Sequence, residues 1–236
     1  MKVLAIDTSS NLCSVAILED TNLIKKIELD NGLTHSETLM PLVKQILDET
    51  NLQLKNFNLL VSDIGPGSFT GIRIGVATCK AFSDSLNIPT VGVSSLEVLA
   101  YSIKKESLIC STIDCKNDNC YFALYELKDE KYNILENPCA KTNKEVIELL
   151  NSKYTKENII FVGNGIMPSK ILNLNTKNQS WNFDEANDKL FLNVENLGIA
   201  GYVKFINNNY KSENILPLYL KKPQAEMQLE AKLKNT

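Results

Sequence analysis

A short pattern that occurs twice in this chain constrains its fold more than any other feature. The pattern reads I-D-x5-C-x2-A-x2-E, and it begins at Ile6 and again 107 positions later at Ile113. Both copies cover two runs of β-forming residues around a polar turn, which is typical of a β-hairpin. A repeated supersecondary pattern indicates two related units. We therefore expect an N-terminal lobe over residues 1–106 and a C-terminal lobe over residues 107–236.

The N-terminal lobe alternates between strand and helix patterns. A capping box at Thr34–Glu37 precedes apolar residues at helical spacing, which predicts a helix over 35–50, bent or delayed by Pro41. Strand and helix in alternation favour an α/β sheet with crossovers over a sandwich. The expected strands are 2–6, 13–18, 24–29, 59–64 and 89–93, and the other expected helices are 70–86 and 95–104.

The C-terminal lobe carries fewer local signals. Its clearest one is a second capping box, formed by Thr142 and Glu145. The expected elements are a helix over 142–150, a long polar surface connection over 173–188, a helix over 195–206, a last strand over 216–220, and a polar end over 225–236 that frays or docks on a partner.

Charge and hydropathy restrict the class of protein. The 236 residues carry a formal net charge of −3, which argues against tight RNA binding by the chain alone, because phosphate neutralisation supplies most of such affinity. No apolar run approaches the about 18–20 residues of a membrane span. Asp7 comes too early in the chain for a secretory signal. We therefore expect a cytoplasmic protein without membrane contact.

Scarce residue types exclude several catalytic designs. His35 is the only histidine, which excludes zinc hydrolysis through two imidazoles, and no G-x-S-x-G motif accompanies it to form a serine triad. None of the six cysteines belongs to a C-x-x-C pair, so free thiols are expected rather than a zinc ribbon. Arg73 is the only arginine among 25 Lys and Arg residues. Either a planar cation with several donors is needed there, or one arginine occurs there by chance.

The densest motif is the glycine-rich stretch GPGSFTGIRIG at residues 65–75, between a predicted strand and a predicted helix. Free amides at a helix N-terminus attract anions. The stretch is not a Walker A motif, and no acid ends the next strand as a dinucleotide site requires. The residues that could bind a nucleotide or another anion here are Gly65, Gly67, Ser68 and Thr70.

Structural interpretations compete with anion binding. Gly71 and Gly75 lie on one helical face, where small residues let another segment approach closely. Asp7, Thr8 and Ser9 follow the first strand and could hold a Mg²⁺-phosphate group in the hairpin. The same residues also form Asx turns, which is their commoner use.

One predicted helix carries an apolar stripe with two possible uses. The stripe comprises Leu39, Leu42, Val43 and Ile46, and it either faces the core or packs against a second subunit. His35, at the start of this helix, is expected to cap it or to face solvent, because a single imidazole binds metals weakly.

The turn after Ile6 and the stretch DIGPGSFTGIRIG at 63–75 are similar to those of the TsaB (YeaZ) family, whose members take part in making threonylcarbamoyladenosine on tRNA. The resemblance is good along the N-terminal lobe and weaker beyond it. It implies the actin-like ATPase (ASKHA) fold, an α/β architecture of two duplicated RNase H-like lobes. This expectation agrees with the repeated hairpin pattern.

The resemblance also implies a role without catalysis. The related catalytic protein TsaD carries a metal-binding helix of the form N/H-H-x-E-x-H, and here Ser95 and Leu99 stand in place of its two imidazoles. The family thus implies a scaffold subunit that forms a heterodimer with TsaD, helps to recruit the ATPase TsaE and meets tRNA only through the complex. In isolation the same surface is expected to form a homodimer. No cofactor is expected on this chain alone, and ATP with Mg²⁺ is possible in the assembled complex.

The family places the interface on the helices at 35–50 and 70–86. The residues expected to contact the partner are Leu39, Leu42, Val43, Ile46, Gly71, Arg73 and Gly75. A rival hypothesis is an ATP-dependent phosphotransferase or ATPase of the same fold, in which Asp7 and Asp114 flank the phosphates. A glycoprotease-type peptidase has little support, because neither a metal cluster nor a catalytic triad is available.

Overall fold

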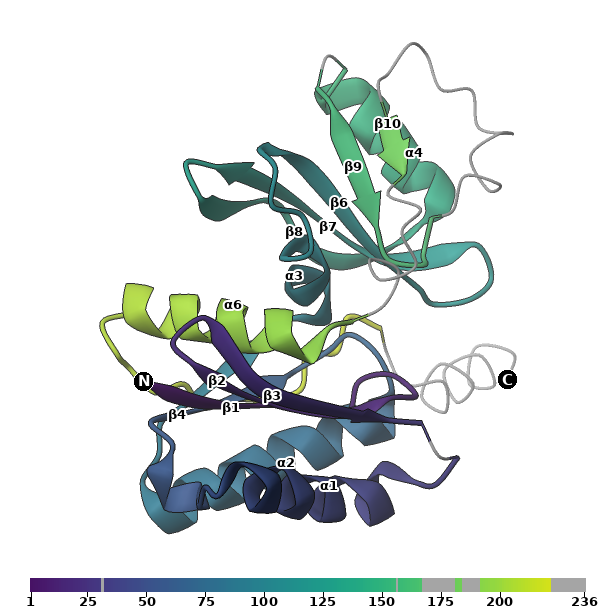
Figure 1. Cartoon of the computed structure of the whole chain (residues 1–236). Helices are drawn as coiled ribbons and strands as arrows, with labels where there is room; N and C mark the ends of the chain where they lie inside the picture. The colour runs from purple at the N-terminus through teal and green to yellow at the C-terminus, as the bar shows by residue number, and fades with distance from the viewer. Residues whose placement is uncertain (31, 156, 167–180, 184–191, 222–236) are drawn as a thin grey trace.

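The computed structural model describes residues 1–30, 32–155, 157–166, 181–183 and 192–221, and it contains two five-stranded sheets (Figure 1). In the first sheet the strands lie in the order β3-β2-β1-β4-β5. The first three strands are antiparallel, and β4 and β5 continue parallel to β1. The strands are β1 (Lys2–Asp7), β2 (Cys13–Glu19), β3 (Asn22–Leu29), β4 (Leu59–Asp63) and β5 (Thr90–Val93).

The second sheet repeats this topology. Read from the other edge, its order is β8-β7-β6-β9-β10, with antiparallel strands on one side of β6 and parallel strands on the other. Ile6 lies in β1 and Ile113 in β6, the equivalent strands of the two sheets. The predicted α/β fold of two duplicated lobes with actin-like ATPase topology is confirmed. The strands are β6 (Ser107–Asp114), β7 (Asn119–Lys128), β8 (Lys131–Thr142), β9 (Ile159–Val162) and β10 (Trp181–Phe183).

Helices bury both faces of the first sheet. α1 and α2 cover one face and α6 covers the other (Figure 1). Successive residues of a strand point to opposite faces, so Leu4 and Ile6 enter the core beneath α1 and α2, while Val3 and Ala5 enter the core beneath α6. The helices are α1 (His35–Thr50), η1 (Leu54–Asn56), α2 (Phe69–Leu86), α3 (Ser95–Ala100), α4 (Asn143–Lys153) and α6 (Val194–Asn207).

Helix α6 follows the second sheet in the sequence but packs on the first. Two glycines permit this close approach. A Cβ atom at Gly198 would clash with the side chain of Leu18, and one at Gly201 would clash with Val61. A helix that follows the second sheet in the sequence therefore completes the core of the first sheet.

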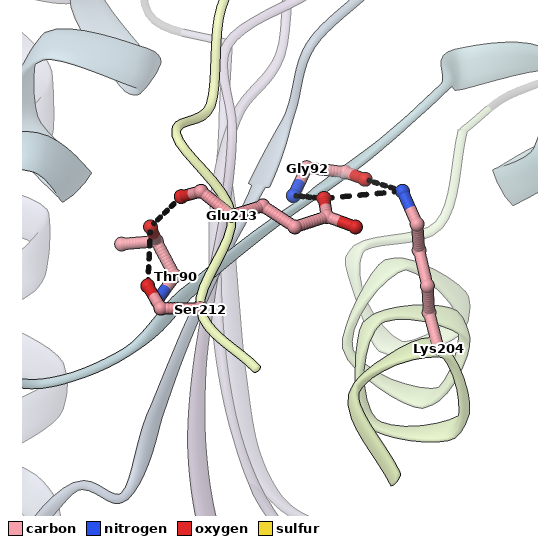
Figure 2. A network of polar contacts seen from close by, with 5 residues as sticks. All are labelled: Thr90, Gly92, Lys204, Ser212 and Glu213. Carbon is pink, nitrogen blue, oxygen red and sulfur yellow. Dashed lines mark hydrogen bonds and ion pairs between the residues drawn. The ribbon is translucent and has the colours of Figure 1, made fainter. Parts of the chain in front are cut away.

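Residues 212–215 run beside β5, the edge strand of the first sheet. The amide of Glu213 donates to the carbonyl of Thr90 at 2.7 Å, and the amide of Thr90 donates to Oγ of Ser212 at 3.0 Å. The Glu213 carboxylate accepts a hydrogen bond from the amide of Gly92 at 3.2 Å (Figure 2). Backbone and side chains together satisfy an edge that an open sheet would leave exposed.

Some predicted boundaries were wrong. Residues 216–220 form no strand, because Pro217 has no amide hydrogen; the amide of Leu218 donates to the carbonyl of Ile64, just after β4, at 2.7 Å. The helix predicted over 95–104 ends at Ala100. The helix predicted over 35–50 is present as α1 with those bounds, and Pro41 does not delay its start. Within the predicted connection 173–188, Trp181–Phe183 form β10; the rest of that connection and the end at 225–236 lie outside the described residues.

Candidate functional site

Asp7, Thr8 and Ser9 form a closed turn at the carboxyl end of β1. Oδ1 of Asp7 accepts hydrogen bonds from the backbone amide of Ser9 at 2.8 Å and from its hydroxyl at 2.7 Å. This is the local bonding of an Asx turn. The three residues are 2%, 1% and 3% exposed, so solvent does not reach them.

A second carboxylate, Asp63 at the end of β4, lies against this turn. Its Oδ2 is 3.2 Å from Oγ of Ser9, and its Oδ1 accepts hydrogen bonds from the amide of Gly65 at 2.6 Å and from the hydroxyl of Ser95 at 2.7 Å. Because the parallel strands β1 and β4 end at the same edge of the sheet, Asp7 and Asp63 both contact Ser9.

The surroundings of the Asp63 side chain favour its protonated form more than water does, because they raise its pKa. Burial raises the pKa of Asp63 well above its usual range, and the neighbouring charge of Asp7 raises it further. Burial also raises the pKa of Asp7, but the two hydrogen bonds from Ser9 oppose that effect. The Ser9 hydroxyl thus lies between the two carboxyl groups, 2.7 Å from Oδ1 of Asp7 and 3.2 Å from Oδ2 of Asp63, and its single proton can be donated to only one of them at a time. Burial and the charge of Asp7 favour the protonated form of Asp63.

The glycine-rich stretch packs directly on this turn. The amide of Ser68 donates to the carbonyl of Ser9 at 2.6 Å, and the hydroxyl of Thr8 donates to the carbonyl of Gly71 at 2.7 Å. A Cβ atom at Gly67 would clash with the Ser9 carbonyl, and one at Gly71 would clash with the Thr8 carbonyl. The glycines are thus needed for contact between two backbones.

Gly75 has the same role one helical turn further on. A Cβ atom there would clash with Oγ1 of Thr8. Together with Gly71, it brings α2 against the turn after β1, and the packing interpretation of these two glycines is confirmed.

The residues of the glycine-rich stretch that were predicted to bind an anion differ in their exposure to solvent. Gly65 is buried together with the turn after β1, whereas Gly67, Ser68 and Thr70 are exposed. A phosphate-binding loop presents free amides to its ligand. Here the amides of Gly65, Ser68 and Gly71 already donate to acceptors of the protein itself. In this conformation the stretch is a structural junction, and nucleotide binding stays a prediction.

The apolar stripe of α1 is core. Leu39, Leu42, Val43 and Ile46 are at most 2% exposed and pack with Leu4, Ile6 and Val15 of the first sheet. The expectation that these four side chains face a partner is therefore not met, because they cover the chain's own sheet. Gly71 and Gly75 are also buried, which leaves Arg73 as the one exposed residue of the predicted interface.

Arg73 lies in an exposed aromatic cluster on α2. Its guanidinium carbon is 3.9 Å from the ring centre of Phe69 and 5.5 Å from that of Tyr219, and its Nε donates to the Tyr219 hydroxyl at 2.7 Å. Phe69 is 38% exposed and Tyr219 46% exposed. A planar guanidinium can stack on a ring and donate along its edge, which an ammonium cannot. This geometry favours the interpretation that the only arginine is needed at its position.

Comparisons with known proteins match a TsaD family model and several TsaB proteins. A family model described as TsaD, tRNA N6-adenosine threonylcarbamoyltransferase, matches residues 32–228. The tRNA threonylcarbamoyladenosine biosynthesis protein TsaB of Bacillus subtilis (strain 168) is 32% identical over 165 residues, which cover 69% of this chain and 71% of that protein. The chain belongs to the TsaB family.

Further TsaB-family matches extend along most of the chain. TsaB of Buchnera aphidicola subsp. Acyrthosiphon pisum is 27% identical over 215 residues, which cover 80% of this chain and 97% of that protein. The solved structure of YeaZ from Pseudomonas aeruginosa has a TM-score of 0.75 at 24% identity and covers 93% of this chain and 99% of that one, so the two share a fold. The predicted resemblance to the TsaB (YeaZ) family is confirmed.

In this TsaB-family chain the two positions expected to lack imidazoles have structural roles. Ser95 donates to Asp63, as described above, and Leu99 is 2% exposed in the core between α3 and the second sheet. In the part of the chain that the structure describes, no three His, Cys, Asp or Glu residues are grouped so as to hold a metal ion. None of the described helices is both long and apolar enough to cross a membrane.

The remaining two predicted residues differ in exposure. His35 is half-buried and its Nε2 lies 2.8 Å from the carbonyl of Ser10, so Nε2 carries the proton and ties the start of α1 to the hairpin turn. Asp114 is exposed, and its amide donates to the side chain of Asn164 at 2.9 Å. The two aspartates of the rival ATPase hypothesis are therefore not equivalent, since Asp7 is sealed from solvent.

Sequence reasoning missed Asp63 and Ser95 as members of this cluster. A signal for Asp63 was present, because it follows an apolar strand directly, as Asp7 does. The contact of Ser95 with Asp63 had no sequence signal, because it depends on how β5 and α3 lie beside β4.

Proposed function

We propose that this chain is a non-catalytic subunit of the tRNA threonylcarbamoyladenosine machinery. In this proposal it pairs with TsaD, helps to recruit TsaE, and meets tRNA only through the complex. The observation that carries it is the closed junction between the turn after β1 and the glycine-rich stretch. A group that makes or breaks bonds must reach its substrate, and Asp7 and Ser9 are both sealed beneath this stretch.

The positions of Ser95 and Leu99 support the same proposal. A metal-binding helix needs side chains that direct ligand atoms into an open site. Here the hydroxyl of Ser95 donates a hydrogen bond to Asp63, and Leu99 is a buried aliphatic side chain. Restoring imidazoles would disturb a packed core rather than fill an empty site.

The exposed surface of α1 and α2 is the proposed docking site for TsaD. The two helices lie side by side on the outer face of the first sheet (Figure 1). Met40 of α1 is 49% exposed, and the Phe69–Arg73–Tyr219 cluster lies on α2 and the segment beside it. Exposed aromatic, Met and Arg side chains are the residue types enriched at protein interfaces. In the absence of TsaD, this surface would pair with a second copy.

Reconstitution tests the proposal. The purified chain, TsaD and TsaE are assayed alone and together for threonylcarbamoyladenosine in tRNA by mass spectrometry of nucleosides, and heterodimers are measured by light scattering. The chain alone should give no product, and its addition to TsaD should yield a stable heterodimer, capture TsaE and raise the modification rate. Modification by the chain alone, or full activity of TsaD without it, contradicts the proposal.

Calorimetry separates this proposal from the rival ATPase. Titration of the chain alone with ATP and Mg²⁺ should give no tight binding, since Asp7 is sealed. Tight binding that Asp7→Ala abolishes, with turnover of ATP, would favour the rival.

A further inference from the structure

A polar cavity lies apart from the junction described above. Its walls come from α3, from the turn between β7 and β8, and from the C-terminal end of α6. Its volume is about 400 Å³, which lies in the range of small-molecule sites. The described residues that line it take no part in the contacts of Asp7, Asp63 or Arg73.

Glu97 of α3 lines this cavity with a carboxylate that lacks a partner. Among the described residues, no hydrogen bond or ion pair reaches its side-chain oxygens. Burial raises the pKa of Glu97; the charge of Lys204 opposes this effect and that of Glu213 adds to it. A largely buried carboxylate without a bonded cation is unfavourable, so a cation that entered the cavity would gain strongly from it.

Lys204, the cation of α6 in the cavity wall, is already engaged. Its Nζ donates to the carbonyl of Gly92 at 2.8 Å and to the Glu213 carboxylate at 3.2 Å (Figure 2). The same carboxylate oxygen accepts from the amide of Gly92, which fixes the pair in place. Glu213 therefore balances the charge of Lys204, and the negative charge of Glu97 remains.

The rest of the wall suits an organic cation. The rings of Tyr101 and Tyr132 stack with centres 4.0 Å apart, and the Tyr132 hydroxyl donates to the carbonyl of Ile103 at 2.6 Å, which holds this wall rigid. Nζ of Lys104 lies 5.8 Å from the centre of the Tyr101 ring, so the tyrosine pair already attracts one cation of the chain. Aromatic faces attract cations and accommodate alkyl chains. Asn133 and Asn207 add uncharged donors and acceptors, while Glu130 and Lys131 carry opposite charges on the exposed turn.

We propose that this cavity binds a small molecule with a primary ammonium group, and that Glu97 is the counter-ion of that group. Its three N–H groups would donate to the Glu97 carboxylate and to the side-chain oxygens of the asparagines, and its alkyl chain would lie along the tyrosine wall. An anionic or uncharged ligand would leave Glu97 unpaired. The inference does not depend on the proposed function, because the two use different surfaces.

Titration of the full chain with putrescine, followed by NMR, tests this assignment. Saturable shifts of the residues around the cavity are expected, and Glu97→Gln should weaken the affinity at least ten-fold. The matched control is Glu148→Gln on the exposed face of α4, which should leave the affinity unchanged. L-Ornithine, which adds an amino-acid end to a similar chain, distinguishes an amino-acid ligand from a plain amine: tighter binding indicates the amino acid, and equal binding the amine.

Three results would overturn the assignment. They are the absence of saturable shifts, equal affinity in Glu97→Gln, and equal binding of 1-butanol, which has no ammonium group. Should Glu97→Gln fail to fold, Asn207→Trp on the exposed rim provides a second test, because the indole would fill the cavity mouth. A folded Asn207→Trp protein that keeps the affinity for putrescine would also refute the assignment.

Discussion

Replacing Asp63 with asparagine should stabilise this protein at alkaline pH and flatten the pH dependence of its stability. Asparagine has the shape of the protonated acid. Its Oδ1 can accept from Gly65 and Ser95 as the carboxyl does, and its amide can donate to Ser9 in place of the acid proton. The variant therefore keeps the hydrogen bonds and removes only the titration.

The sign of the effect follows from the raised pKa of Asp63. Between the usual aspartate pKa of 3.8 and the raised pKa of the folded state, the folded state holds a proton that the unfolded chain releases. That contribution to stability is complete below the unfolded pKa and is lost as the pH rises through the folded pKa. One proton corresponds to a slope of up to about 1.4 kcal/mol per pH unit between those two values.

Urea unfolding of wild type and Asp63→Asn over roughly pH 4 to 8 measures this slope. The free energy of unfolding of the wild type should fall relative to the variant as the pH rises. Asp84→Asn, on the exposed side of α2, is the matched control and should track the wild type. Parallel curves for wild type and Asp63→Asn, or a variant that is less stable at pH 8, would refute the raised pKa of Asp63.

Three further substitutions test the packing and the exposed cluster. Leu39→Glu should unfold the chain, as measured by circular dichroism, because it buries a charge without a partner at a cost of several kcal/mol, whereas Met40→Glu should stay folded. Equal melting temperatures of the two variants would place the stripe at the surface. Gly71→Ala should lower the free energy of unfolding in urea by more than Gly32→Ala does. The Gly32 variant is destabilised only by its positive φ, at about 1 kcal/mol, because no atom lies near the position of its Cβ. The reverse order would contradict the backbone junction. Arg73→Lys should weaken binding to TsaD about ten-fold by calorimetry, more than a Lys→Arg exchange on the same helix, because it loses the ring contacts; unchanged affinity would indicate that this arginine occurs there by chance.

The local elements were readable because their signals lie within a few residues. Thr34 and Glu37 form the predicted capping box at the start of α1, and Thr142 and Glu145 form the one at the start of α4. The repeat that begins at Ile6 and Ile113 corresponded to equivalent strands, because a hairpin pattern with two buried faces keeps its spacing when a lobe is duplicated.

The tertiary structure decided the use of each ambiguous motif. Glycines at 67, 71 and 75 suit an anion site and a backbone contact equally, and the position of the Thr8–Ser9 turn selected the second use. The stripe at Leu39 fits a core and an interface equally, and the sheet beneath α1 selected the core.

The sequence by itself therefore determined the hairpins, the helices, the duplication and the family. Only the tertiary structure decided that α6 covers one face of the first sheet, that burial raises the pKa of Asp63 and that Glu97 lines a cavity. The physical reason is that periodicity and capping act between near neighbours in the chain. Burial, by contrast, depends on which distant surfaces meet, and it is burial that sets the charge state and the accessibility of a side chain.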